Sequence, residues 1–224
     1  MRWMGKLARG IIAALDSSGW EEPGSAPPVV SEVHASWAGC DYAIRVTQCM
    51  RYEPYPKTVY RISARVAAEA SGAARATLAS VVLGESETVP AIAIAANDAG
   101  LVVGYSEEAS YGSIGTLSNG HAVQLDPRTL AVVRHVKMFG GASLPTGTAG
   151  GWGSLKVGRL TIVNHATLVV EGTLSGNHID VWTVQGVGGY WSTPYDGSSP
   201  RATSFSATFP GFFTRPQAPS LIIY

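Results

Sequence analysis

The stretch "DYAIRVTQCMRYEPYPKTVYRISARVAAE" (41–69) alternates apolar and polar residues on both sides of "EPYP" (53–56). A period of two is that of a strand with one buried face, and a turn-forming break between two such runs is typical of a hairpin. The residues that share the apolar face are Tyr42, Ile44, Val46, Tyr60, Ile62, Ala64 and Val66. The stretch therefore predicts two antiparallel strands, and with them a mainly β fold.

The polar face of this hairpin carries Arg45, Arg51, Arg61 and Arg65. A turn around Pro54–Tyr55 that puts Arg51 opposite Val59 would place Arg45 opposite Arg65, and like charges directly opposite each other destabilise a sheet. We expect solvent, counter-ions or acidic residues elsewhere in the fold to offset them, or alternatively an acidic surface on a partner. The second alternative makes Arg45 and Arg65 candidate partner-binding residues.

Eight further segments have the length and composition of short strands. They are 76–84, 89–96, 101–106, 121–125, 130–138, 158–164, 166–173 and 178–184. Turn-forming residues stand between them, in "NDAG" (97–100), "SNG" (118–120), "DPRT" (126–129) and "SGN" (175–177). Short strands at regular intervals predict an antiparallel β-sandwich or a barrel-like domain over residues 29–185.

The two ends of the chain differ from this domain. Residues 1–20 are predicted to form a short amphipathic helix over 4–15, and "EEPGSAPP" (21–28) has the composition of a linker. Segment 186–224, which could also complete the β domain, is rich in Gly, Pro and aromatic residues and ends on "LIIY". We expect it to form a last strand or an extended arm that adds to a neighbouring subunit. The candidate partner-binding residues of the two ends are Leu7, Ile11, Leu15, Leu221, Ile222, Ile223 and Tyr224.

Composition excludes several classes of protein. The chain has 224 residues, 46% of them hydrophobic and 14% charged, and its 16 basic residues balance 16 acidic ones. It is too apolar for a disordered chain, and it has no global field toward nucleic acid or an acidic membrane. No apolar run approaches the roughly 20 residues of a membrane span, and "IIAAL" (11–15) is too short for the core of a signal peptide. Cys40 and Cys49 have opposite parity on one strand, which argues against a disulfide between them.

The sharpest chemical pattern is "NHATLVVEGTLSGNHIDVWTV" (164–184). A hairpin turning at 175–176 would place Glu171 opposite Asp180, with His178 beside Asp180. Two facing carboxylates repel each other unless a cation, a shared proton or a histidine lies between them. The pattern thus gives a candidate structural calcium or other divalent metal site, and otherwise a solvated hairpin tip. No other cofactor is expected.

A group of aromatic residues follows in the sequence, comprising Trp182, Tyr190, Trp191 and Tyr195. Aromatic faces beside Gly, Ser, Asn and Asp are typical of sugar-binding surfaces, so a cell-surface glycan is a candidate ligand. The alternative is that Trp182 belongs to the core and the others anchor loops.

No catalytic motif such as G-x-S-x-G, H-E-x-x-H or a P-loop occurs in the sequence. This weakens an enzymatic function without removing it, and three classes of function remain. The preferred one is a non-enzymatic structural subunit that binds other protein subunits in a homo-oligomer or a hetero-assembly. Virion proteins of tailed phages share this β-rich, Lys-poor texture with extended termini, which favours a tail, tail-tip or fibre-associated component, located in a virion particle or the host cytoplasm. The alternatives are a carbohydrate-binding β module and a hydrolase built on Glu171 and Asp180.

Overall fold

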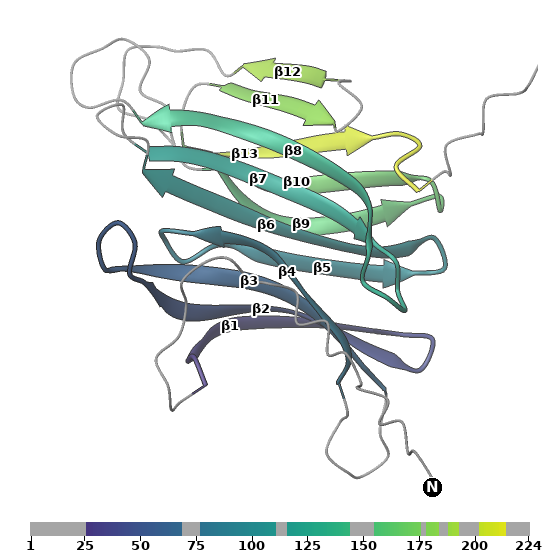
Figure 1. Cartoon of the computed structure of the whole chain (residues 1–224). Coiled ribbons are helices and arrows are strands. Elements are labelled where there is room, and N and C mark those ends of the chain that lie inside the picture. Colours follow the sequence, from purple (N-terminus) through teal and green to yellow (C-terminus); the bar gives the residue numbers. More distant parts are fainter. Residues whose placement is uncertain are drawn as a thin grey trace, which may run out of the picture.

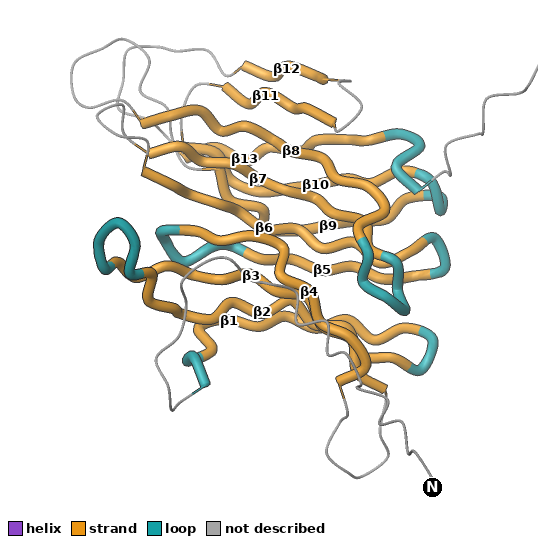
Figure 2. The backbone as a smooth tube through the Cα atoms, in the orientation of Figure 1, coloured by secondary structure: helices purple, strands orange, loops and turns teal. Residues whose placement is uncertain are grey.

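The computed structural model describes residues 26–68, 77–110, 116–143, 155–175, 178–183, 188–192 and 202–213. Within these ranges there are thirteen strands and no helix. The strands are β1 (Val29–Trp37), β2 (Cys40–Arg51), β3 (Lys57–Ala68), β4 (Thr77–Ser86), β5 (Ile92–Asn97), β6 (Gly100–Ser110), β7 (Thr116–Leu125), β8 (Val132–Ser143), β9 (Leu155–Val163), β10 (Thr167–Ser175), β11 (His178–Thr183), β12 (Gly188–Ser192) and β13 (Ala202–Phe209). The described connections are turns and short loops at the ends of the strands (Figure 2).

These strands form three antiparallel sheets, so the mainly β, antiparallel prediction is confirmed. The first sheet has the order β1-β2-β3-β4, the central sheet β12-β11-β8-β7-β6-β5, and the third sheet β13-β10-β9. In Figure 1 the first sheet lies at the bottom, the central sheet rises above it, and the third sheet lies behind the central one.

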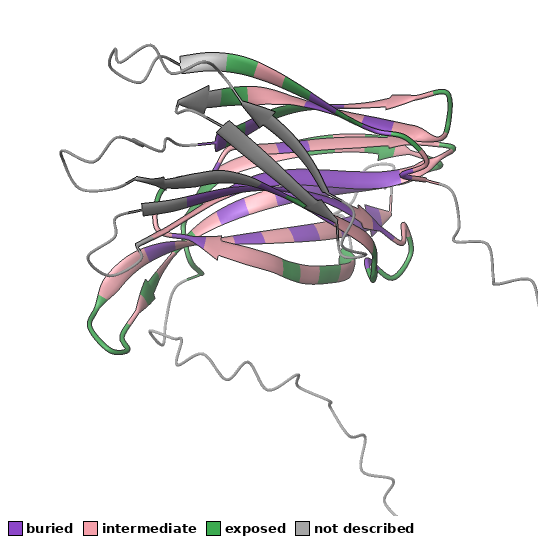
Figure 3. Ribbon diagram, turned by 90° about the horizontal axis from the view of Figure 1, so that it is seen from above, coloured by how far each residue is buried: buried purple, intermediate pink, exposed green. Residues whose placement is uncertain are grey.

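The central sheet contributes to two separate cores, because side chains alternate between the two faces of a strand. On β6, Leu101, Val103 and Tyr105 belong to the core shared with the first sheet, whereas Val102 belongs to the core shared with the third. The first core also contains Tyr42, Ile44, Val46, Ile62, Ala64, Val66, Val123, Leu125 and Leu130. The second contains Ala122, Val136, Met138, Leu155, Val157, Leu168, Val170, Phe209 and Phe212. Buried positions thus alternate with less buried ones along several strands (Figure 3).

The central and third sheets approach each other closely where the central sheet has small residues. A Cβ added at Gly104 would lie 2.8 Å from Cγ1 of Val157, and one added at Gly120 would collide with Leu155. Two buried serines of the central sheet also reach across this interface. The Ser106 hydroxyl accepts a 2.8 Å hydrogen bond from the backbone N–H of Val157, and the Ser118 hydroxyl accepts one of 2.8 Å from Leu155. These hydroxyls therefore accept hydrogen bonds from backbone N–H groups of β9, which is an edge strand of the third sheet among the described strands.

The hairpin predicted from residues 41–69 is confirmed as β2 and β3, but the predicted register is wrong by two residues. Arg45 lies opposite Ser63 rather than Arg65, and the closing pair is Arg51 and Lys57. The pairing of the two strands centres on Pro54, and the loop between the paired residues Arg51 and Lys57 is therefore shorter than expected. Because the shift is an even number of residues, each side chain stays on its predicted face.

Two local predictions from turn-forming residues need correction. "SNG" (118–120) is not a turn, since it lies inside β7 and is buried. The hairpin predicted over 164–184 is also wrong, because β10 pairs with β9 and β13, whereas β11 pairs with β8 and β12. The distant strand β13 pairs with β10 because Ala207 and Phe209 thereby join the second core.

Candidate functional site

A row of polar side chains crosses the face of the central sheet that is turned toward the first sheet. This polar row consists of Glu107 on β6, Asn119 and His121 on β7, and His135 and Lys137 on β8. The register brings them together, since Glu107 lies opposite Asn119, and His121 lies opposite Lys137. Strand alternation puts all five on the same side as Tyr105, a member of the first core. The polar row therefore begins where that core ends.

His121 is the centre of a chain of contacts. Its ring is stacked between Tyr105 and His135, with ring centroids 4.6 Å and 5.0 Å away. Nδ1 of His121 lies 2.8 Å from Nε2 of His135, so one ring donates a hydrogen bond and the other accepts it. Nε2 of His121 lies 2.9 Å from a carboxylate oxygen of Glu107. A carboxylate and two imidazoles thus form a continuous chain across three strands.

Electrostatics in this chain favour one ionised carboxylate and a neutral outer imidazole. The pKa of Glu107 is lowered, chiefly by its contact with His121, against the opposing effect of burial. The pKa of His135 is lowered to about 4, first by burial and then by the nearby His121 and Lys137. Burial raises the pKa of the Tyr105 hydroxyl, which donates a 2.9 Å hydrogen bond to the carbonyl of Leu83. His135 is therefore neutral at pH 7.

Two atoms of the polar row lack a well-aligned hydrogen bond despite their burial. Oδ1 of Asn119, whose residue is 2% exposed, has no partner. Nε2 of His121, 4% exposed, lies 2.9 Å from a carboxylate oxygen of Glu107, but the contact lacks the geometry of a hydrogen bond. Leaving a buried polar group unpaired costs about 1–3 kcal/mol, so such groups usually indicate a water, an ion or a ligand.

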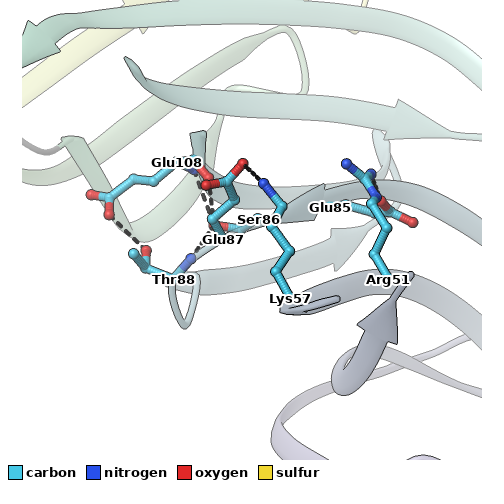
Figure 4. Close-up of polar contacts among 7 residues, drawn as sticks. All are labelled: Arg51, Lys57, Glu85, Ser86, Glu87, Thr88 and Glu108. Carbon is cyan, nitrogen blue, oxygen red and sulfur yellow. Dashed lines mark hydrogen bonds and ion pairs between the residues drawn. The ribbon is translucent and has the colours of Figure 1, made fainter. Parts of the chain in front are cut away.

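The end of β4 is fastened to β6 beside the polar row (Figure 4). The Ser86 hydroxyl accepts a 3.0 Å hydrogen bond from the backbone N–H of Glu108, and the Thr88 hydroxyl donates one of 2.6 Å to the Glu108 carboxylate. Lys57 and Glu87 form an ion pair nearby. These contacts fix the first sheet against the central sheet and therefore hold one border of the polar row in place.

The arginine face predicted for the hairpin exists, and acidic residues of the same fold offset it. Glu32 on β1 lies 2.9 Å from Nε of Arg45 and 2.6 Å from a terminal nitrogen of Arg65. The carboxylate of Glu85 on β4 lies 2.6 Å from a terminal nitrogen of Arg51 and 3.8 Å from Nε of Arg61. Burial raises the pKa of Glu32, but hydrogen bonds from Arg45 and Arg65 outweigh it, and the pKa is lowered overall. Binding of a partner by Arg45 and Arg65 stays a prediction.

The geometric basis of the predicted metal site is absent. Glu171 lies opposite Ser206 and Arg159, with its carboxylate 3.8 Å from Nε of Arg159. Asp180 lies opposite Tyr190 and Phe139 in another sheet. Among the described side chains no three His, Cys, Asp or Glu residues are arranged to hold a metal. Metal binding by Glu171, His178 and Asp180 thus stays a prediction without its expected pairing.

The aromatic group is partly brought together by the backbone. Pairing of β11 with β12 puts Trp182 opposite Gly188, Asp180 opposite Tyr190 and Ile179 opposite Trp191. Trp182 also lies opposite Lys137 of the polar row. Tyr195 lies outside the described residues, as do the predicted N-terminal helix with Leu7, Ile11 and Leu15 and the C-terminal residues Leu221, Ile222, Ile223 and Tyr224.

Sequence reasoning missed the polar row, although part of its signal was present. Residues 121–125 and 130–138 were expected to be strands around a turn at "DPRT", and that turn forms, with Oδ1 of Asp126 accepting hydrogen bonds from the backbone of Arg128 and Thr129. Pairing the two strands across this turn would have brought His121 near His135. Asn119 was missed because Asn-Gly is the strongest short signal for a turn.

Comparison of the chain with protein-family models, with curated proteins and with solved structures finds no match. In the part of the chain that the structure describes, no helix has the length and apolar character needed to cross a membrane.

Proposed function

We propose that this protein is a non-enzymatic structural subunit of a larger protein assembly, and that it associates through the edges of its first sheet. The observation that carries the proposal is β4, which among the described strands lies at an edge of the first sheet and whose residues from 77 to 84 are all uncharged. Leu78 and Val82 on this strand are 60% and 54% exposed. Soluble proteins usually protect an edge strand with charge, because an apolar edge invites pairing with another strand.

The opposite edge of the same sheet supports a contact between copies of the chain. β1 begins with Val29 and Val30, which are both exposed. A contact between β4 of one copy and β1 of the next joins two different surfaces, so it repeats into a ring or an open filament. Such repetition suits the tail, tail-tip or fibre-associated virion component that the sequence texture favours.

Two cores on opposite faces of one sheet favour the sandwich alternative over a barrel as the scaffold.

The test is the native mass of the full chain by light scattering across a range of concentrations. We expect oligomers that Val82→Lys and Val30→Lys each reduce to monomers, because each lysine introduces a charge at one of the two contacting edges. Val133→Lys is the matched control, since this exposed valine lies on β8, inside the central sheet.

A mixture of the two edge variants separates this contact from general loss of solubility. Each variant keeps one intact edge, so the equimolar mixture should form a dimer and nothing larger. A wild-type chain that stays monomeric at every concentration, or edge variants with wild-type mass, would refute the proposal.

A further inference from the structure

We propose that His121 and His135 form a pH-dependent switch on the central sheet, in which the closed histidine pair accepts one added proton and a second proton drives the His135 ring away from His121 toward solvent. The switch lies on a face of the sheet rather than at a sheet edge, so this inference does not depend on the assembly proposal.

The switch is a direct contact between imidazole rings on neighbouring strands. Nδ1 of His121 lies 2.8 Å from Nε2 of His135, and the ring planes are 22° apart. At this distance one nitrogen donates a hydrogen and the other accepts it. A doubly protonated pair carries a hydrogen on both nitrogens, so neither can accept. The closed geometry therefore excludes the second proton.

Glu107 determines where the first added proton resides. Its carboxylate lies 2.9 Å from Nε2 of His121, and an anion this close favours the charged form of an imidazole. The lowered pKa of Glu107 agrees with a carboxylate that stays ionised beside His121. A protonated His121 donates through Nδ1 to a neutral His135, so the first proton leaves the histidine pair closed.

The surroundings of His135 oppose the second proton. Titratable groups on four strands surround this ring: Glu107 and Tyr105 on β6, His121 on β7, Lys137 on β8 and, at a greater distance along the register, Asp180 on β11. The first sheet meets this group through the uncharged carbonyl of Leu83, which accepts the hydrogen bond of Tyr105. Burial, His121 and Lys137 lower the pKa of His135 to about 4, while Glu107 acts in the opposite direction. Two imidazolium rings in contact repel each other, so the second proton opens the pair.

Burial decides which of the two rings moves. His121 is 4% exposed, and its ring lies 4.6 Å from that of Tyr105, a member of the first core. His135 is only partly buried, and Lys137 two positions further along β8 is exposed. His135 therefore turns outward, whereas His121 stays between Tyr105 and Glu107. Opening uncovers the Nδ1 edge of His121.

The first experiment follows the side-chain nitrogens of both histidines by NMR in the full-length protein. We expect a scalar coupling between Nδ1 of His121 and Nε2 of His135 at about pH 7, and its loss as the pH falls through about 4. Glu107→Gln should move the first protonation step of the pair to lower pH, because it removes the nearby anion. Glu108→Gln is the matched control, since the carboxylate of this adjacent residue engages Thr88 instead, and it should leave the step unchanged.

Two variants keep the test decisive if the protein unfolds before the histidine pair opens. His135→Lys places a permanent positive charge on β8 at neutral pH, and it should hold the switch open. Diethyl pyrocarbonate should then modify His121 several-fold faster than in the wild type, as measured by mass spectrometry. His135→Gln is uncharged and should leave His121 protected.

Four results would overturn the proposal. They are a missing coupling at neutral pH, a coupling that survives in the folded protein at about pH 3, a first protonation step that Glu107→Gln leaves in place, and equal modification of His121 in His135→Lys and His135→Gln.

Discussion

Gly172 marks the point at which the backbones of β9 and β10 approach too closely for a side chain. A Cβ at this position would strike the backbone carbonyl of Lys156, and it would lie 2.8 Å from a ring carbon of Phe205. A backbone atom within a sheet cannot move aside cheaply, so we expect Gly172→Ala to destabilise the protein by about 1–3 kcal/mol. Gly158→Ala on β9 is the control, because its Cβ would make only ordinary contacts, the nearest at 3.6 Å. Urea denaturation of both variants measures the difference, and equal stabilities would contradict the expectation.

His135 makes stability depend on pH at the scale of one side chain. Its pKa is about 4 in the folded protein, against an ordinary value near 6.5 in the unfolded chain. Between these values the unfolded chain binds more protons, so stability falls as the pH falls from 6.5 to 4. Because the ring is only partly buried, we expect a loss of roughly 1–2 kcal/mol rather than the full value of the shift. Glu107, whose pKa is also lowered, adds to the loss below about pH 4.5.

Unfolding curves at several pH values check this dependence, with His135→Gln as the comparison. The variant should lose most of the change between pH 6.5 and 4, because glutamine does not titrate there. A variant whose stability follows the same pH curve as the wild type would show that His135 is not its source.

At the scale of the strand, hydroxyl groups replace a neighbouring strand along part of β9. Ser106 and Ser118 accept hydrogen bonds from the backbone N–H groups of Val157 and Leu155, and the alanine variants would leave those buried donors unpaired. We expect Ser106→Ala and Ser118→Ala each to cost about 1–3 kcal/mol. Ser80→Ala, on the exposed face of β4, should stay within about 0.5 kcal/mol of the wild type. Amide hydrogen exchange gives a specific readout, since Val157 should lose protection in Ser106→Ala and keep it in Ser80→Ala.

Strands could be predicted from the sequence wherever one face is apolar and the partner lies next along the chain. The β2–β3 hairpin met both conditions, and even its register error preserved the faces. The pairings that were predicted wrongly involve strands whose true partner is not the next strand along the chain. β10 takes β13 as a partner from about 30 residues away, and β11 joins the central sheet instead of its neighbour in sequence. Local turn signals such as "SNG" carry no information about burial from a second sheet, and this is why Asn119 was assigned to a turn.

At the scale of the whole molecule, the central sheet joins two cores that would otherwise be independent. Adjacent residues of β6, Val102 and Val103, point into opposite cores. Loss of either core would therefore expose one face of the same strand and remove the support of the other. Among the described strands, neither outer sheet shares a backbone ladder with the central one. Their coupling therefore depends on side-chain packing and on single bonds, such as those from Val157 to Ser106 and from Glu87 to Glu108. This arrangement predicts that both cores unfold in one transition.

Two truncations, one in each core, test that cooperativity. Ile62 belongs to the core under the first sheet and Leu168 to the core under the third, and both are fully buried. Ile62→Ala and Leu168→Ala should each lower the unfolding free energy by about 2–5 kcal/mol, because each leaves a cavity. In urea, circular dichroism and tryptophan fluorescence should give the same midpoint for each variant, as expected for two-state unfolding. Midpoints that separate in Ile62→Ala but coincide in Leu168→Ala would mean that the first sheet unfolds on its own, and that the central sheet is supported chiefly by the third.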